Sequence, residues 1–315
     1  MIEVAVLGRI GYDLCAEEQH VPLAAVRRFS RYLGGSSANM AVGLARLGVR
    51  VGMVSALGTD GISQFLVDFL RAEQVDTTYV KQAAGLLPSL ALTEVSPPDR
   101  FPQVFYRQDP ADVHIELGED ELGYIAGARM FITNGTSLCA SPSRESTYLA
   151  LERARAAGGR VVLDVDYRWM SWPRPEEAGL AVRLALPCVD VLLANEAELK
   201  MVAGAATLEE ATERVLARGL PVLVSKLGDR GTRVWCGHES VFLEPYRVEV
   251  VSTIGAGDGF AVGFLYALLR GKPTPECLHY GNAAAAIVVS RLSCSEAMPT
   301  LAEVEELIGR YTPAR

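Results

Sequence analysis

The sequence has few of the residues that build metal clusters or disulfide frameworks. Its 315 residues include six cysteines and four histidines. The cysteines are scattered, with no CxxC pair, which favours reduced thiols over disulfide bonds. The histidines (His20, His114, His238 and His279) form no group with the spacing of metal ligands. We therefore expect no zinc site.

Positive charge is also in short supply. Thirty lysines and arginines stand against 38 aspartates and glutamates, which gives a formal net charge of −8. This balance argues against nucleic acid or an anionic membrane as the main partner, although a local arginine pocket would still admit a small anion. No apolar run is long enough to cross a bilayer, and residues 1–8 lack the basic start of a signal peptide. We expect a cytoplasmic protein.

Hydrophobic residues make up half of the chain, and they form strand-like and helix-like runs in turn. The alternation is regular from residue 128 onward. It predicts a doubly wound, mostly parallel central sheet flanked by helices. Strand-like segments without helices at about 14–33 and 77–108 predict a small inserted β-sheet that forms a lid over a site. No linker or repeat divides the chain, so we expect residues 1–315 to form a single domain.

A glycine-rich turn in VSTIGAGDGFAVGFLYALLRG (251–271) is the first candidate site. Gly255, Ala256 and Gly257 precede Asp258, and apolar residues with helical spacing follow. The pattern predicts a tight turn into a buried helix, whose first backbone N–H groups lack partners and attract an anion. Asp258 either caps this helix or takes a proton from an alcohol that attacks a bound phosphoryl group.

A second glycine turn opens the helical segment 34–48. Gly34 and Gly35 form either a plain loop or a bare backbone against which a ligand lies, and Asn39 offers both a donor and an acceptor. Asp13 follows the first strand-like run, where an aspartate alone is typical of a turn.

Charged residues follow several other predicted strands. Arg168 and two aspartates alternate near the end of 160–168, at the edge of a parallel sheet where ligands bind. Arg107 lies at the edge of the predicted lid. It is either a solvated surface charge, or its planar guanidinium binds a carboxylate or phosphate. Asn195 and Glu198 open a helix, either as a capping box or as oxygen groups that hold the waters of Mg²⁺.

Four segments in register resemble the signatures of the ribokinase-like (PfkB) carbohydrate kinases. They are GGSSANMAVGLARLG (34–48), NEAE (195–198), KLGDRG (226–231) and GAGDGF (255–260). The resemblance covers nearly the whole chain. It implies one α/β domain with a β-sheet lid, and transfer of the γ-phosphoryl group of ATP, with Mg²⁺, to a sugar hydroxyl.

The resemblance also implies a role for each matching residue. Asp258 matches the catalytic base, and the backbone amides that stabilise the transferring phosphoryl group match Gly255, Ala256 and Gly257. Sugar contacts are implied for Asp13, Gly34, Gly35 and Asn39. Nucleotide contacts are implied for Lys226, Gly228, Gly231 and Asn282. The metal-associated pair is Asn195 and Glu198.

One position departs from the family pattern. Ser252 stands where relatives usually carry an aspartate that helps to bind a monovalent cation, so activation by potassium is left open. Asp258 is present, which argues against a catalytically silent sugar- or nucleotide-sensing protein on the same fold. A dinucleotide-dependent enzyme would need GxGxxG after the first strand, where this chain reads GRIGYD.

Three further segments narrow the resemblance within the family. FYRQDPAD (105–112), DVDYRWMSWP (164–173) and VVSRLSCSEAMPT (288–300) resemble the kinases of 5-dehydro-2-deoxygluconate in inositol catabolism. The first two also resemble kinases of 2-keto-3-deoxygluconate. Both substrates are sugar acids, and Arg107 with Arg168 suits a carboxylate better than the neutral sugar of a fructokinase. We expect transfer to a primary hydroxyl of a sugar acid, and a homodimer that pairs through the lid.

Overall fold

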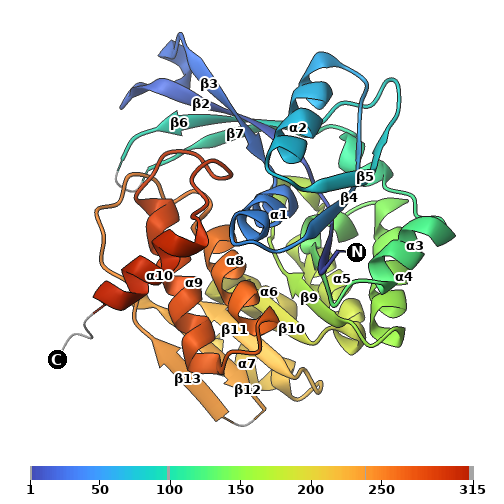
Figure 1. The fold of residues 1–315 in the computed structure, drawn as a ribbon, viewed down its shortest axis with the longest axis vertical. Helices are drawn as coiled ribbons and strands as arrows, with labels where there is room; N and C mark the ends of the chain where they lie inside the picture. Colours follow the sequence, from blue (N-terminus) through green and yellow to red (C-terminus); the bar gives the residue numbers. More distant parts are fainter. Residues whose placement is uncertain (1, 98–99, 238, 312–315) are drawn as a thin grey trace.

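The computed structural model describes residues 2–97, 100–237 and 239–311 (Figure 1). Its centre is a nine-stranded sheet in the order β13-β12-β11-β10-β9-β8-β1-β4-β5. Neighbouring strands from β5 to β11 are parallel, whereas β12 is antiparallel to both β11 and β13. The strands are β1 Val4–Leu7, β4 Val51–Leu57, β5 Asp76–Gln82, β8 Met130–Asn134, β9 Arg160–Asp164, β10 Val191–Asn195, β11 Val222–Lys226, β12 Thr232–Cys236 and β13 Glu239–Leu243.

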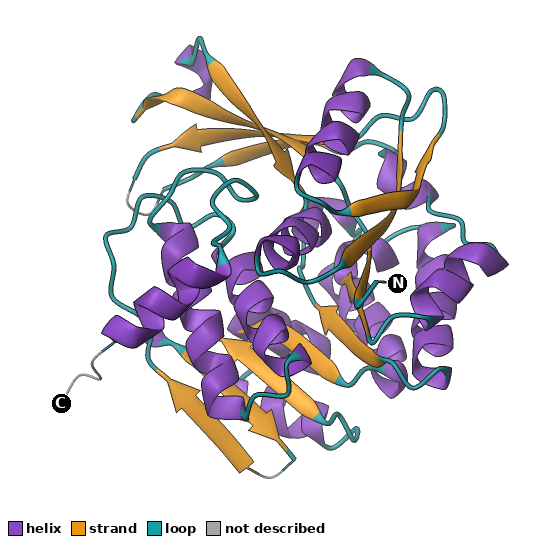
Figure 2. Ribbon diagram, in the orientation of Figure 1, coloured by secondary structure: helices purple, strands orange, loops and turns teal. Residues whose placement is uncertain are grey.

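Helices cover both faces of this sheet, as Figure 2 shows. The core on one face takes side chains from α1 Ser36–Arg46, α2 Gly61–Ala72, α8 Ala256–Leu269, α9 Thr274–Val289 and α10 Leu301–Arg310. The core on the other face takes them from α3 Glu119–Ala126, α4 Ser143–Ala156, α5 Pro175–Ala185, α6 Glu196–Ala203 and α7 Leu208–Leu216. Successive residues of β1 enter opposite cores, because side chains alternate along a strand. This burial on both sides explains why inner parallel strands such as β1 and β10 are mostly apolar.

A separate four-stranded sheet, here called the small sheet, lies apart from the helical layers (upper left in Figure 1). Its order is β3-β2-β6-β7. The strands are β2 Gly11–Gln19, β3 Phe29–Gly34, β6 Ser89–Val95 and β7 Gln103–Tyr106. The doubly wound central sheet and the additional small sheet agree with the fold class expected from the sequence.

One predicted strand of the small sheet belongs elsewhere. Residues 77–82 were expected in the inserted sheet, but they form β5, which pairs in parallel with β4 at the edge of the central sheet. An edge strand has one side open to solvent, and most of β5 is only partly buried. Its polar composition therefore resembles that of a solvated inserted strand.

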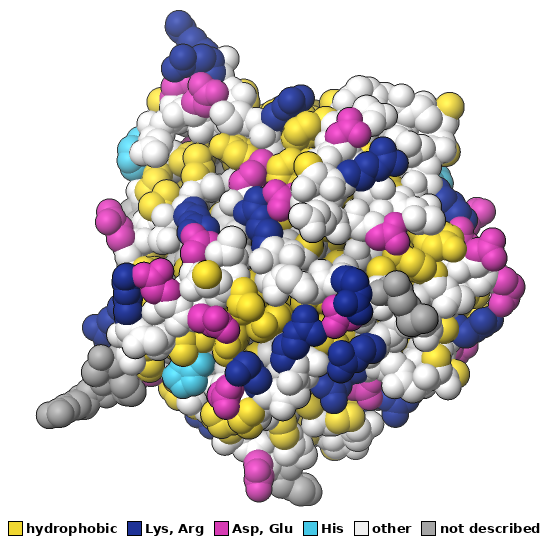
Figure 3. Space-filling model, viewed as in Figure 1, with side chains coloured by type: hydrophobic (Ala, Val, Ile, Leu, Met, Phe, Trp, Pro, Cys, Tyr) yellow, Lys and Arg dark blue, Asp and Glu magenta, His cyan; other side chains and the backbone are white. Residues whose placement is uncertain are grey.

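The lengths and hydropathies of the helices decide whether any of them could span a membrane. Within the described part of the chain, none is both long and apolar enough to cross a bilayer. Figure 3 shows acidic and basic side chains mixed over the face in view.

Candidate active site

A cleft of about 520 Å³ lies where the carboxyl ends of β9, β10 and β11 meet the starts of α1 and α8. Phe101, Gln103 and Phe105, from the small sheet and the loop before β7, line its remaining side. In parallel sheets this edge is where ligands bind. A larger hollow of about 980 Å³ lies at the amino-terminal ends of the strands. It contains none of the predicted site residues, and Arg155 and Arg270 there are paired with Asp190 and Glu3.

Asp258 lies in the first turn of α8, but its carboxylate is held by α1. Ser36 Oγ donates to Oδ1 at 2.7 Å, and Asn39 Nδ2 donates to Oδ2 at 2.8 Å. No side chain caps the start of α8. Of the two interpretations of Asp258, the helix cap is therefore wrong. The carboxylate lines the cleft, where it can accept a proton from a bound ligand.

The turn before Asp258 presents open backbone to the same cleft. Gly255 has φ +83°, a left-handed conformation that glycine adopts without strain. Among the described residues, the N–H groups of Gly257 and Asp258 have no acceptor, as expected for the first turn of a helix. A Cβ at Gly257 would lie only 3.4 Å from Nζ of Lys226. An anion at this turn would therefore meet the helix N-terminus and an ammonium group together.

The turn at Gly34 and Gly35 has a steric reason for each glycine. A Cβ at Gly34 would lie 2.2 Å from Oδ2 of Asp13, and a Cβ at Gly35 would lie 2.5 Å from the carbonyl oxygen of Arg9. Gly35 also has φ +94°. The bare backbone thus makes room for the Asp13 carboxylate, which lines the cleft. Burial raises the pKa of Asp13 to about 6, although the positive charges of Arg9 and Arg168 oppose this shift.

Asn195 and Glu198 form the capping box of α6. Asn195 Oδ1 accepts from the Glu198 N–H at 2.9 Å, and Glu198 Oε2 accepts from the Asn195 N–H at 2.7 Å. Both residues line the cleft beside Asp164, whose carboxylate accepts from Lys226 Nζ at 2.8 Å. Burial favours a lower pKa for the Lys226 ammonium, but the carboxylates of Asp164 and Glu198 outweigh burial and raise the pKa.

The predicted nucleotide residues separate into two groups. Lys226 and Gly228 line the cleft, whereas Gly231 and Asn282 do not. Gly231 has φ +103°, and a Cβ there would lie 2.4 Å from the carbonyl oxygen of Leu243. Asn282 Nδ2 donates to the carbonyl of Glu244 at 2.8 Å. In this structure Gly231 allows a close backbone contact with Leu243, and Asn282 holds the backbone at Glu244 by a hydrogen bond.

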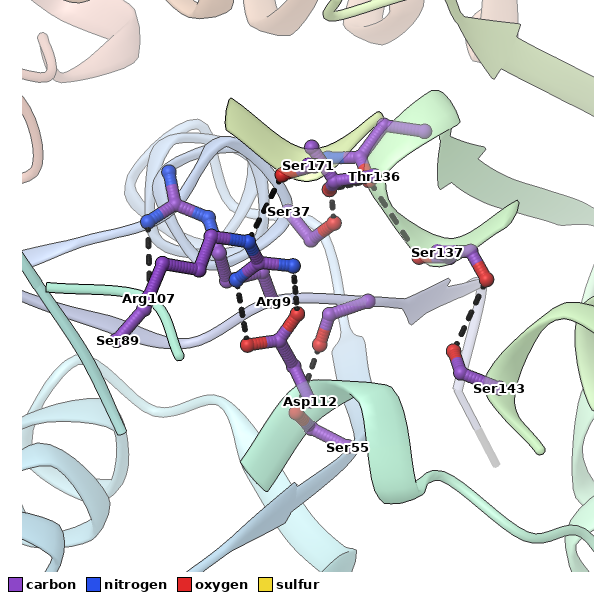
Figure 4. A network of polar contacts seen from close by, with 12 residues as sticks. Arg9, Ser37, Ser55, Ser89, Arg107, Asp112, Thr136, Ser137, Ser143 and Ser171 are labelled. Carbon is purple, nitrogen blue, oxygen red and sulfur yellow. Dashed lines mark hydrogen bonds and ion pairs between the residues drawn. The ribbon is translucent and has the colours of Figure 1, made fainter. Parts of the chain in front are cut away.

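The two arginines expected to hold a carboxylate lie in different places. Arg168 lines the cleft, where it pairs with Asp166 at 2.8 Å. Arg107 does not line this cleft, and its side chain is only 4% exposed. Figure 4 shows its guanidinium bound by both carboxylate oxygens of Asp112 (2.8 and 2.5 Å) and by Ser171 Oγ (2.9 Å). The expectation that Arg107 faces the ligand is therefore corrected. Its guanidinium is already bound by the buried carboxylate of Asp112.

Arg9 is a cleft residue that the sequence analysis missed. It follows β1, is 6% exposed, and donates from Nη1 to Ser89 Oγ at 3.1 Å (Figure 4). The sequence offered one signal, since Arg9 is the second residue after a strand of the parallel sheet. The segment GRIGYD (8–13) supplied Asp13 as a candidate site residue, but Arg9 was not included.

Unpaired polar atoms gather in this cleft. Over the described ranges, six buried side-chain nitrogen or oxygen atoms have no hydrogen-bond partner. Four of them belong to cleft residues: Arg9 Nε, Asn39 Oδ1, Asp166 Oδ2 and Arg168 Nε. An unpaired buried polar group costs about 1–3 kcal/mol, so such groups are normally satisfied. Their concentration in one cleft indicates a polar ligand.

Metal coordination by a cluster of histidine, cysteine and acidic side chains finds no support in the described ranges. They contain no group of three or more such residues placed to hold a metal ion. His238, one of the four histidines, lies outside those ranges.

Comparison with known proteins gives consistent matches over most of the chain. The family model for "pfkB family carbohydrate kinase" matches residues 1–301. A 5-dehydro-2-deoxygluconokinase from Geobacillus thermodenitrificans is 35% identical, with 100% of this chain and 95% of that protein covered. The crystal structure of a PfkB protein from Polaromonas sp. JS666 superposes with a TM-score of 0.85 at 27% identity, covering 97% of this chain and 99% of that one. A fructokinase with bound ATP from Xylella fastidiosa has a TM-score of 0.86 at 26% identity, with 98% and 99% covered.

Proposed function

The chain belongs to the pfkB family of carbohydrate kinases, and from this membership we propose that it transfers the γ-phosphoryl group of ATP to a primary hydroxyl of 5-dehydro-2-deoxygluconate. The name of the relative from Geobacillus thermodenitrificans supports this substrate. The observation that carries the proposal is the Asp258 carboxylate, held by Ser36 and Asn39 beside the open N-terminus of α8.

Asp258 acts as the general base in this proposal. The sugar hydroxyl oxygen attacks the γ-phosphorus in line, a new O–P bond forms, and the bond from the γ-phosphorus to the ADP oxygen breaks. An alcohol is far more basic than a carboxylate, so the proton passes to Asp258 late, after bond formation has made the hydroxyl more acidic. The two hydrogen bonds from α1 keep the carboxylate aimed at the cleft.

Backbone and ammonium groups stabilise the charge on the transferring phosphoryl group. The N–H groups at the start of α8, in the turn of Gly255, Ala256 and Gly257, supply fixed dipoles that need no reorganisation during the reaction. Lys226 adds a full positive charge within the reach of the same anion. Gly228 lies on the nucleotide side of the cleft in this proposal.

The oxygen groups at the ends of β9 and β10 suit a magnesium ion. Asp164, Asn195 and Glu198 line the cleft, and Mg²⁺ prefers oxygen ligands while it keeps several waters. Both Glu198 oxygens already accept backbone N–H groups, so this side chain would contact the waters of the ion. A bound Mg²⁺ would neutralise phosphate charge.

The sugar acid occupies the side of the cleft nearest the small sheet. Asp13 and Asn39 hold its hydroxyls, and Arg168 attracts its carboxylate. We further propose that residues 1–315 act as one kinase domain, and that the small sheet closes over the sugar as a lid. Closure would exclude water, which otherwise competes with the sugar for the phosphoryl group.

An ATP-consumption assay over sugar acids and neutral sugars tests this function. The expected result is the highest kcat/KM with 5-dehydro-2-deoxygluconate. A higher value with 2-keto-3-deoxygluconate, or with fructose, would replace the proposed substrate. No consumption with any sugar, in a folded protein that still binds ATP, would favour a silent sensor on this fold.

A further inference from the structure

We propose that Arg9, together with Arg168, binds the carboxylate of the substrate and sets the preference of the enzyme for sugar acids over neutral sugars. The inference rests on the proposed function and extends it to a residue outside the four segments that resemble the family signatures.

Arg9 is a buried cation that forms no direct ion pair with a carboxylate of the described residues. Its guanidinium stays protonated at any physiological pH. Among the described residues it makes no ion pair, and its one hydrogen bond goes to the neutral hydroxyl of Ser89. Its Nε is fully buried and has no partner. Burial of an unpaired charge costs several kcal/mol, so this arrangement is best explained by an anion that arrives with the ligand.

The other cations in and around the cleft already have carboxylate partners. Lys226 pairs with Asp164, Arg168 with Asp166, and Arg107 with Asp112. Asp112 binds Arg107 through both oxygens, which leaves no free fork on that residue. Arg9 is therefore the cleft cation best placed to accept a new anion.

The position of Arg9 favours the sugar over the nucleotide. Its backbone carbonyl touches the Gly35 turn, and a Cβ at Gly11 in β2 would lie 2.9 Å from its Nη1. Both neighbours belong to the Asp13 side of the cleft, whereas the open helix N-terminus and Lys226 form the phosphate side. Arg9, Arg168 and Asp13 all line this cleft, which brings the two guanidinium groups into one cavity. Two guanidinium groups suit the planar oxygens of a carboxylate.

The test compares the sugar acid with its neutral C1 amide in wild type and variants. Arg9→Met is expected to lower kcat/KM for the acid by roughly 10²-fold, the effect of removing one partner from a buried charge pair. The amide should lose less than about 3-fold, because it carries no charge for Arg9 to bind. The acid-to-amide ratio therefore falls, mainly through KM for the acid, since this contact is made before and during the reaction.

The matched control removes a cation that lies outside the cleft. The double variant Arg107→Met with Asp112→Leu deletes a buried ion pair as a unit, which is often near neutral for stability. It is expected to keep the acid-to-amide ratio of wild type. If the acid-to-amide ratio falls in this control but stays at the wild-type value in Arg9→Met, carboxylate recognition belongs to Arg107 and the inference is overturned.

A thermal melt establishes whether each variant folds. If Arg9→Met does not fold, Arg9→Lys decides, because lysine keeps the charge but lacks the planar fork. A fall of at least about ten-fold in its acid-to-amide ratio supports the inference, and a wild-type ratio overturns it.

Wild type separates this inference from the proposed function. If wild type phosphorylates neutral sugars and not sugar acids, both fail. If wild type prefers the acid, but Arg9→Met lowers acid and amide equally, only the role of Arg9 fails.

Discussion

The chemistry of each carboxylate in the cleft depends on the groups that contact it. Asp258 accepts two side-chain hydrogen bonds from another helix, Asp164 pairs with Lys226, and Asp13 is accommodated by the missing side chain of Gly34. The three carboxylates thus have three environments. They suit a proton acceptor, a charge near the metal and a sugar contact, respectively.

Asp258→Asn tests the proton acceptor. The amide nearly matches the carboxylate in shape but is a very poor base, so kcat should fall by roughly 10²–10⁴-fold while KM for ATP changes little. Steady-state kinetics with saturating sugar acid measure both values. Ser36→Ala removes only one of the two hydrogen bonds to the carboxylate and should cost less. Turnover at the wild-type rate in Asp258→Asn would contradict the assignment.

The raised pKa of Asp13 predicts a pH-dependent stability. Its pKa rises from 3.8 to about 6 on folding, because burial disfavours the charge. The folded state then binds the proton more tightly than the unfolded chain, so wild type loses stability as the pH rises through this window. Relative to wild type, Asp13→Asn should gain up to about 3 kcal/mol between about pH 4 and pH 7, at about 1.4 kcal/mol per pKa unit. Urea unfolding at each pH measures the difference, and a difference independent of pH would refute the raised pKa.

Some of these residues were predictable from the sequence and others were not. Asp258, Gly34 and Gly35 were predicted because special residue types mark their turns. That Arg9 lines the cleft and Arg107 does not was not predictable, because the partner of Arg107 depends on where Asp112 lies in the folded chain. The sequence shows that an arginine is charged, but it does not show which carboxylate the arginine pairs with.

Helices and strands of this fold bring the site together through their ends. The starts of α1, α6 and α8 and the ends of β9, β10 and β11 all meet at the cleft. The regular βα alternation made this architecture predictable, since parallel strands place their carboxyl ends on one edge. The assignment of β5 failed because an edge strand and an inserted strand are both partly solvated.

A comparison with the capping box of α10 separates the structural role of the α6 capping box from its proposed role in Mg²⁺ binding. Asn195→Ala should lower the free energy of unfolding by about 1 kcal/mol and raise the Mg²⁺ concentration needed for half-maximal activity. Thr300→Ala breaks the equivalent box of α10, which does not line the cleft. It should cost similar stability and leave the Mg²⁺ dependence unchanged. Equal Mg²⁺ dependence in both variants would leave Asn195 with a structural role only.

The whole molecule combines a negative overall charge with a cleft that gathers cations. The formal net charge is −8, yet Arg9, Arg168 and Lys226 line one cavity. The composition therefore argues against a polyanionic main partner, and it still allows a small anionic substrate. The sequence pattern predicted pairing through the lid but could not name the residues that pair, because these depend on which apolar side chains remain exposed after folding.

The small sheet exposes apolar side chains through which we expect two copies to pair. Val104 and Tyr106 of β7 are 47% and 63% exposed, and Leu87 before β6 is 61% exposed. We expect a homodimer in solution, and Tyr106→Glu should convert it to a monomer, because burial of an unpaired carboxylate opposes association. Leu184→Glu, at an equally exposed apolar position on α5, should remain dimeric. Light scattering after size exclusion measures the mass, and a wild-type monomer would refute pairing.

The hydrogen bond between Ser36 and Asp258 spans 222 positions of the chain. A growing polypeptide on the ribosome contains the turn at Gly34 and Gly35, and later Lys226, before Asp258 is added. Until α8 has been synthesised and packs against α1, the carboxylate proposed as the base lacks the two hydrogen bonds that hold it in the cleft. The onset of catalysis is therefore a late event in biosynthesis, and activity itself reports that the two ends of the protein have met.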